Sequence, residues 1–272
     1  MERRLFCQLS PTTYRISVEK NRMQRRLKDM GTKKVFAKQK GQPLPVTIYR
    51  HGSLIRRALG NVDPRLQGNK ATNLAIAAPK ISHILIRPGE TFSFWKLVGN
   101  TTAKKGYREG LVLKGGHSDS GIGGGMCQFT NLIHWMVLHS DLEIVEHHHH
   151  DGYDLFPDFG RQVPFGTGTS IFYNYLDYRF YNGTDRTYQL VVTVDAAYLR
   201  GELRCSEPVE FSYHIETEKE KFVREDGIVY RTGEVYRSKV DKKTGETVEK
   251  QLLRKNHARV MYDTAGLEIE ET

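Results

Sequence analysis

The sequence predicts an α+β fold, with a mixed or antiparallel sheet packed around a central apolar helix and a β-rich C-terminal appendage. Three observations predict it: an apolar helical run over residues 126–139, alternating segments over 170–181 and 187–199, and charged alternating pieces beyond residue 207 with turns at Asp226-Gly227 and Lys243-Thr244-Gly245. The helical run is apolar nearly all round, which is typical of a helix at the centre of a core. Alternation of side chains is typical of strands.

Size and composition are those of an ordinary globular protein. The chain has 272 residues, of which 38% are hydrophobic and 27% charged, and this length allows a well-buried core. No run of about 18 apolar residues exists, so no transmembrane helix is expected. The basic N-terminus lacks an apolar segment typical of a secretory signal, which favours a cytoplasmic location. Three cysteines, at positions 7, 127 and 205, indicate neither a disulfide framework nor a C-x-x-C metal site.

Charge and pattern divide the chain into three parts: a basic N-terminal segment over residues 1–68, a core over 69–204 and a β-rich extension over 205–272. Residues 1–70 contain 17 Lys and Arg against 4 Asp and Glu, whereas the other 202 residues contain 24 against 28. The basic segment could contact nucleic acid, an anionic membrane surface or an acidic cell-wall precursor, or form a solvated arm. Few aromatic side chains are available to stack on bases, so no nucleic acid is expected.

Two further helices are predicted from apolar periodicity. Residues 18–30 place Met23, Leu27 and Met30 on one face of a basic amphipathic helix that stops at Gly31. Residues 69–81 form a second helix, which Pro79 is expected to end or kink because proline lacks an N–H group and clashes with the preceding turn.

Short extended segments and two loops account for the rest of the core. Strands are predicted over residues 46–51, 83–87, 111–114 and 142–145, with an extended piece over 91–95. A glycine-rich loop spans residues 115–125, and an irregular loop spans 151–168. An Asn182-Gly183 turn is expected to join strands 170–181 and 187–199 as a hairpin.

The glycine-rich stretch before the apolar helix leads into Cys127, which is the main candidate for chemistry. A cysteine in the first turn of a helix is close to unpaired N–H groups and to the positive end of the helix dipole. Both favour the thiolate, the nucleophilic form. A small buried residue can start a core helix in the same way, so residue types alone leave a nucleophile and a structural cysteine about equally supported.

A nucleophilic thiol needs a base and a partner that orients the base. Four histidines follow the strand at residues 142–145, and alternation would place His148 and His150 on one face, with His147 and His149 on the other. Asp177 is a candidate to hold the imidazole. The backbone N–H groups of Gly123, Gly124 and Gly125, together with Gln128, are candidates to stabilise an oxyanion.

Other histidines and a metal site are the alternatives. His117, in the glycine-rich loop, is a further candidate for the site. His134 lies about 10 Å along the helix axis from Cys127, and a satisfied core histidine is the favoured interpretation. The histidine tract and Cys127 supply ligands that suit zinc or copper, but neighbouring histidines in a strand diverge, so neither a metal nor another cofactor is predicted.

Several motifs together resemble the VanW family, named for an accessory protein of vancomycin-resistance clusters. The resemblance covers roughly residues 70–200 and rests on two specific pieces, PGETFSFW at residues 88–95 and GGGMCQ at 123–128. Further matching positions are Asn131, Leu132, Glu146, His148, His150, Asp177 and Asn182. The chain differs at His147, where the family pattern has arginine.

The resemblance implies peptidoglycan chemistry. Extracellular proteins of this family are linked to L,D-transpeptidation, in which the cysteine attacks a stem peptide. Transferred to this sequence, Cys127 would be acylated and His148 or His150 would be the base. Cross-linking takes place outside the membrane, so a cytoplasmic chain would act on a precursor or serve as a non-catalytic accessory that binds cell-wall precursors.

Overall fold

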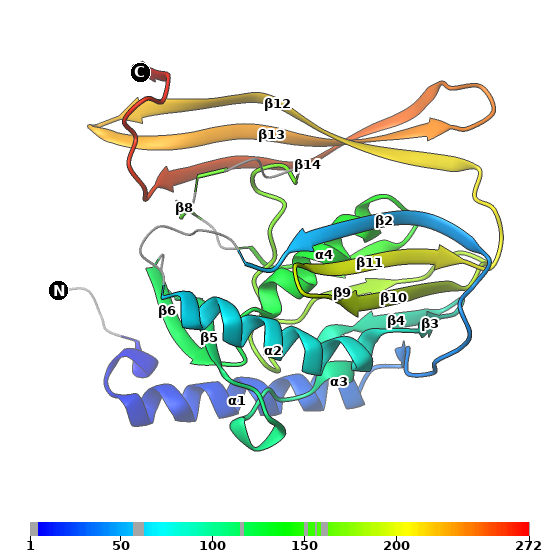
Figure 1. The fold of residues 1–272 in the computed structure, drawn as a ribbon, viewed down its shortest axis with the longest axis horizontal. Helices are drawn as coiled ribbons and strands as arrows, with labels where there is room; N and C mark the ends of the chain where they lie inside the picture. Colours follow the sequence, from blue (N-terminus) through cyan, green and yellow to red (C-terminus); the bar gives the residue numbers. More distant parts are fainter. Residues whose placement is uncertain are drawn as a thin grey trace.

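The computed structural model describes residues 5–56, 63–114, 117–149, 152–155, 157–158 and 163–271, and it confirms the α+β class. Helices and both mixed and antiparallel sheets are present (Figure 1). Within the described ranges, no helix combines the length and apolar character needed to cross a bilayer.

An antiparallel sheet packs against two helices in the core. Its strands, in spatial order, are β2 (Val46–Leu54), β11 (Tyr198–Cys205), β10 (Tyr188–Val194) and β3 (Ile84–Ile86). Helix α4 (Met126–Leu138) packs on β11 and β2, and α2 (Pro64–Ile81) packs on β10. Residues before position 68 thus supply a full strand of the core sheet.

A second, mixed sheet lies beside the first and supports the candidate site. Its order is β1 (Val35–Phe36), β4 (Glu90–Ser93), β9 (Arg179–Tyr181) and β7 (Glu143–Glu146), with β1 and β4 parallel. A separate hairpin is formed by β5 (Glu109–Lys114) and β6 (His117–Ile122). The remaining helices are α1 (Pro11–Met30), α3 (Phe94–Val98) and two 3₁₀ turns, Phe6–Gln8 and Ala103–Lys105.

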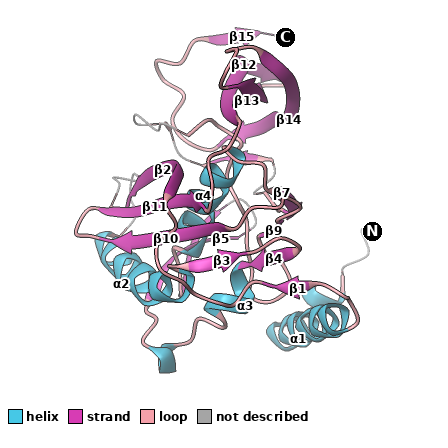
Figure 2. Ribbon diagram, turned by 90° about the vertical axis from the view of Figure 1, so that its right-hand side faces the viewer, coloured by secondary structure: helices cyan, strands magenta, loops and turns pink. Residues whose placement is uncertain are grey.

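The C-terminal extension forms a long, twisted sheet above the core (Figures 1 and 2). Its order is β15 (Ile269–Glu271), β12 (Phe211–Glu225), β13 (Ile228–Asp241), β14 (Thr247–Val260) and β8 (Tyr153–Asp154). Asp226 and Gly227, both with positive φ, make the turn between β12 and β13. Such φ values are those of the two-residue turns that match strand twist.

Helix α4 is buried along its length. Ten of its thirteen residues are buried, and six of these belong to the main core cluster: Met126, Phe129, Leu132, Ile133, Met136 and Val137. Phe129, in the first half of the helix, is fully buried and meets the ring of Phe94 edge-on at 5.6 Å. Burial of an aromatic side chain of this size is a large apolar contribution to stability.

Two helical predictions differ from the structure in their limits. Helix α1 begins at Pro11 rather than residue 18, because Ser10 caps it by accepting a hydrogen bond from the Thr13 N–H at 3.2 Å. Helix α2 begins at Pro64 and continues two residues past Pro79. Because Pro79 lies in the last turn, any bend that it causes displaces only the two residues that follow it.

The extended pieces flanking α4 were predicted less well. Residues 91–95 do not stay extended, because helix α3 begins at Phe94. Ser93 caps this helix by accepting a hydrogen bond from the Lys96 N–H at 3.3 Å. The predicted glycine-rich loop contains strand β6. Strand β7 ends at Glu146, so His147 to His149 lie outside any strand. The rings of His147 and His149 still lie together, with centroids 3.9 Å apart, whereas His148 pairs with Glu146.

The long strand predicted over residues 170–181 is also wrong. A tight turn closes between Phe172 and Leu176, with Asn174 at φ 99°, and only Arg179–Tyr181 forms a strand. Asn182-Gly183 does not make a hairpin, because β9 and β10 belong to different sheets. The hairpin lies instead between β10 and β11.

Candidate functional site

Cys127 is the second residue of α4 and lines a cavity of about 600 Å³. The side chain is half-buried. The cavity wall also contains Trp95 and Tyr173, together with the cationic residues Arg22 and Lys70. None of the described lining residues is acidic. The cavity therefore presents a thiol in a positively charged, partly aromatic environment, which suits a ligand with a negative group.

The three glycines before Cys127 are required by backbone geometry. Gly123 and Gly125 have φ values of 81° and 102°, which disfavour residues with a side chain. Gly124 has no room for one, because a Cβ there would lie 2.2 Å from the carbonyl carbon of Gly110. At Gly125 a Cβ would meet the Lys70 side chain at 2.4 Å. The motif thus seats the start of α4 against β5 and α2.

Two of the predicted oxyanion donors are already used inside this turn. The Gly123 N–H donates to the Arg108 carbonyl at 2.9 Å, and the Gly124 N–H donates to the Gly121 carbonyl at 3.1 Å. The Gly125 N–H donates no hydrogen bond found among the described residues. Of the three glycine N–H groups, that of Gly125 is therefore the best candidate to meet a ligand.

Gln128 is also not placed as predicted. Its amide nitrogen donates to the Ser53 hydroxyl at 2.8 Å and to the Leu54 carbonyl at 2.9 Å. An amide nitrogen has two hydrogens, so both are donated to residues at the end of β2. Gln128 fixes α4 to the core sheet instead of donating to an oxyanion.

Burial changes the expected electrostatics of Cys127. Desolvation raises the pKa of its thiol above the ordinary value, and a hydrogen bond from the Ile171 N–H only partly opposes this. The N–H of Cys127 at the helix start also lowers the pKa, but desolvation outweighs it, so the net shift disfavours the thiolate. A base is needed to remove the proton.

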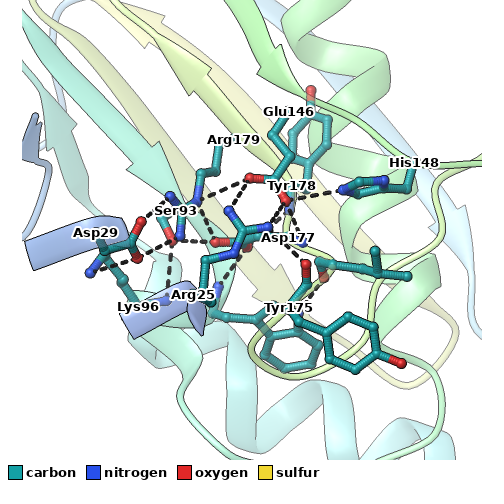
Figure 3. Close-up of polar contacts among 12 residues, drawn as sticks. Arg25, Asp29, Ser93, Lys96, Glu146, His148, Tyr175, Asp177, Tyr178 and Arg179 are labelled. Atoms are coloured by element: carbon teal, nitrogen blue, oxygen red, sulfur yellow. Dashed lines mark hydrogen bonds and ion pairs between the residues drawn. The ribbon is translucent and has the colours of Figure 1, made fainter. Parts of the chain in front are cut away.

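His148 is held in position by a carboxylate, but that carboxylate is Glu146 rather than Asp177. The Nε2 atom of His148 lies 3.0 Å from Oε1 of Glu146, as Figure 3 shows. The His148 side chain is not among the described residues that line the Cys127 cavity. Within the described part of the chain, the two residues are linked only through the backbone: the His148 carbonyl accepts the Ser170 N–H at 2.7 Å, and the N–H of the next residue, Ile171, donates to Cys127. His150 lies outside the described residues, and the side chain of His117 is not described.

Asp177 is a buried structural hub. It accepts hydrogen bonds from the Ser93 hydroxyl at 2.5 Å, from the Trp95 N–H at 3.0 Å and from Nε of Arg179 at 2.8 Å. These partners belong to α3, β9 and the residue that caps α3. Four acceptor sites are available on a carboxylate, and Asp177 uses them to join two elements of the second sheet rather than to orient a histidine.

Helix α1 completes this network, which sequence reasoning did not find. Nη1 of Arg25 donates to Glu146 at 2.6 Å, and its Nη2 donates to the Tyr175 carbonyl at 2.8 Å (Figure 3). Asp29 accepts both Nη atoms of Arg179, at 2.6 and 2.8 Å. Burial raises the pKa of Glu146, but the hydrogen bonds that it accepts from Arg25, the Asp177 N–H and His148 outweigh this effect. The net shift is downward, so the carboxylate is charged at neutral pH. The partners are separated by more than 100 residues, so no local pattern could reveal them.

His134 is a core histidine, as the sequence favoured. It is buried, and its Nδ1 lies 3.1 Å from the Tyr178 hydroxyl. The His147 ring packs in a tilted arrangement against those of His134 and His149, with centroid distances of 4.1 and 3.9 Å. Burial and the neighbouring histidine lower the pKa of His147 to about 3, so it is neutral near pH 7. Among the described residues, no group of three His, Cys, Asp or Glu side chains is arranged to hold a metal ion.

A second cavity of about 350 Å³ adjoins the first. Both are lined by Lys70 and Gln128, and the second is closed by residues of the C-terminal sheet, including Arg254 and Asn256 of β14. The extension therefore contributes to a surface next to the Cys127 cavity. The sequence of the extension predicted its strands, but not that they lie beside the Cys127 cavity.

A family model and a curated relative indicate the same family. The family model described as "VanW like protein" matches residues 69–204. The chain is 33% identical over 219 residues to the vancomycin B-type resistance protein VanW of Enterococcus faecalis, covering 80% of this chain and 79% of that protein. It is 30% identical over 117 residues to the uncharacterized protein YoaR of Bacillus subtilis, covering 42% of this chain and 36% of that protein. No solved structure matches.

Proposed function

The chain belongs to the VanW family, and from that premise we propose that it functions in glycopeptide resistance through peptidoglycan metabolism. The printed name of the Enterococcus faecalis relative, which is similar over about four fifths of both chains, supports the resistance role. The chemistry proposed is acyl transfer on a peptidoglycan stem peptide or its precursor. One observation supports this chemistry above the others: Cys127 lines a cavity at the first turn of α4.

The cavity suits a peptide substrate with a free carboxylate. Arg22 and Lys70 contribute positive charge to its lining, and Trp95 and Tyr173 contribute aromatic surface. Positive charge attracts the carboxylates of a stem peptide, and the aromatic surface packs against its apolar groups. The Gln128 N–H donates to the Gly125 carbonyl at 3.0 Å. The N–H groups of Met126 and Cys127, in the first turn of α4, are therefore the candidates to stabilise charge that develops on a carbonyl oxygen.

The reaction begins with a proton transfer from Cys127 to His148. The thiolate sulfur attacks the donor peptide's carbonyl carbon, the carbonyl re-forms, and the C–N bond breaks. His148 returns the proton to the leaving amine. The acceptor amine then attacks the thioester carbon and gives a proton to His148. The C–S bond breaks to release the cross-linked peptide, and His148 passes the proton to the departing sulfur to restore the thiol. Glu146 stabilises the imidazolium of His148 in both steps, since it lies 3.0 Å from Nε2.

Mass spectrometry of the intact protein tests the nucleophile. After incubation with a stem-peptide donor, we expect the mass of the acyl group on a peptide that contains Cys127. Cys127→Ala should give no adduct. Cys7→Ser is the matched control, since it removes the other cysteine that is not fully buried and should leave the adduct unchanged. An adduct that persists in Cys127→Ala would overturn the assignment.

A non-catalytic accessory that binds cell-wall precursors is the second candidate. Two observations favour this role. The pKa of the Cys127 thiol is raised, and the N–H groups of Gly123, Gly124 and the Gln128 side chain donate to other groups of the protein, so they are not available to a ligand. In that case, Cys127→Ala should retain full function in a glycopeptide resistance assay in a host that lacks its own copy. A loss of resistance in Cys127→Ala, with Cys7→Ser unaffected, would reject the accessory role.

A further inference from the structure

Helix α1 binds the rest of the protein through its polar face. Its contacts to the core are made by Arg22, Arg25 and Asp29, and Val18 is its sole buried residue. These four positions fall within about 60° of the helix circumference at 3.6 residues per turn. The usual arrangement places apolar side chains against the core and polar ones in solvent. Helix α1 has the opposite arrangement.

The apolar side chains of α1 face solvent. Ile16, Met23, Leu27 and Met30 are 53%, 63%, 57% and 76% exposed, and they form a second stripe about 60° wide, roughly 140° from the docked face. Leu5, Phe6 and Leu9, just before the helix, are also more than half exposed. Figure 2 shows α1 at the margin of the molecule, with its outer side free of other elements. A continuous apolar surface of this kind indicates an interaction site.

Basic side chains border this apolar stripe. Arg15 and Arg26 lie on one side of it and Lys20 on the other, and all three are exposed. The one acid on this outer side, Glu19, pairs with Arg22. A helix with an apolar stripe between cationic residues has the character of helices that lie in the interface of an anionic membrane. A second copy of the chain is disfavoured as the occupant, because like charges would be brought together.

We propose that α1 binds the surface of an anionic phospholipid bilayer, with the stripe of Ile16, Met23, Leu27 and Met30 inserted among the lipids. The flanking Arg15, Lys20 and Arg26 contact the phosphate headgroups. This binding does not depend on the chemistry proposed for Cys127. It has a consequence for the cavity, because Arg22 on the docked face of α1 lines it. The Cys127 cavity would then lie about one helix diameter, roughly 10 Å, from the membrane surface.

Flotation of the full chain with vesicles tests this surface. We expect it to bind phosphatidylcholine vesicles that contain about one third phosphatidylglycerol, and to bind pure phosphatidylcholine at least about tenfold more weakly. The double variant Met23→Gln, Leu27→Gln should weaken binding to the anionic vesicles by about tenfold or more, because two inserted side chains are lost. Arg15→Gln with Arg26→Gln should weaken binding to the anionic vesicles and reduce its sensitivity to salt.

The matched control is Val248→Gln, Leu252→Gln, which changes two exposed apolar residues of β14 and should float like the wild type. All substituted side chains are exposed, and circular dichroism should show an unchanged fold. Failure of the wild type to float would overturn the proposal, as would a Met23→Gln, Leu27→Gln variant that floats equally well. A concentration-dependent dimer in sedimentation that this variant abolishes, without flotation of the wild type, would assign the stripe to a second copy instead.

Discussion

Helices α1 and α4 are both amphipathic or apolar segments near the candidate site, yet the protein uses them in opposite ways. Ten of the thirteen residues of α4 are buried, whereas Val18 is the one buried residue among the twenty of α1. Helix α4 is held by apolar packing and supplies the thiol. Helix α1 is held by ion pairs and supports Glu146, which orients His148. Helix α4 is therefore part of the core, whereas α1 lies on its surface and is held there by ion pairs.

The largest expected difference between the two helices is in stability. Phe129→Ala in α4 should lower the free energy of unfolding by about 3–5 kcal/mol, because a fully buried ring is replaced by a cavity. Met23→Ala in α1 should change it by less than about 0.5 kcal/mol. Urea unfolding at equilibrium measures both. Equal losses would mean that α1 packs more deeply than the contacts of Val18 indicate.

An intermediate effect is expected from the charged contacts of α1. Arg25→Gln should destabilise the protein by about 2–3 kcal/mol, because Glu146 is largely buried and would keep only part of its pairing. Lys28→Gln, an exposed position of the same helix, should have almost no effect. Limited proteolysis should also cut residues 11–30 faster in Arg25→Gln. The same cutting rate in both variants would show that the Arg25 contact does not hold α1.

A smaller effect is expected from acid, and it should arise in α4. Burial lowers the pKa of His139, at the end of α4, to about 4. The unfolded state binds a proton near pH 6.5 that the folded state refuses, so stability falls as pH decreases from about 6.5 towards 4. His139→Gln should remove about 1–2 kcal/mol of the loss between pH 7 and pH 5. The control is His257→Gln, which changes an exposed histidine in β14 and should keep the wild-type loss of stability. If stability in this control did not depend on pH, the loss would arise from His257 rather than from His139.

Local pattern was enough to predict α4 and the turns of the C-terminal sheet. An apolar run that begins after three glycines can hardly form anything but a buried helix, and Asp226-Gly227 has a strong preference for a tight turn. The same reasoning failed over residues 170–181. The alternation there resembles a strand, but Asn174 takes a positive φ and closes a turn that lines the cavity at Phe172 and Leu176.

The motifs named several residues of the candidate site, but they did not predict how these residues are connected. The Cys127 cavity and the Glu146–His148 pair contain residues that the motifs pointed to. Asp177, Gln128 and two of the three glycines serve the fold instead, because their hydrogen bonds go to Arg179, Ser53 and neighbouring carbonyl groups. A motif identifies polar residues that matter. It does not say whether their donors and acceptors face a ligand or the protein.

The sequence by itself determined the α+β class, the apolar character of α4 and the periodicity of Met23, Leu27 and Met30, since each follows from residue types at short spacing. Only the tertiary structure decided which way the stripe of α1 faces, because periodicity is the same for an inward and an outward face. It also decided that Arg25 meets Glu146, 121 residues away. Contacts between distant segments depend on how the sheets bring their ends together, and no local preference encodes that meeting.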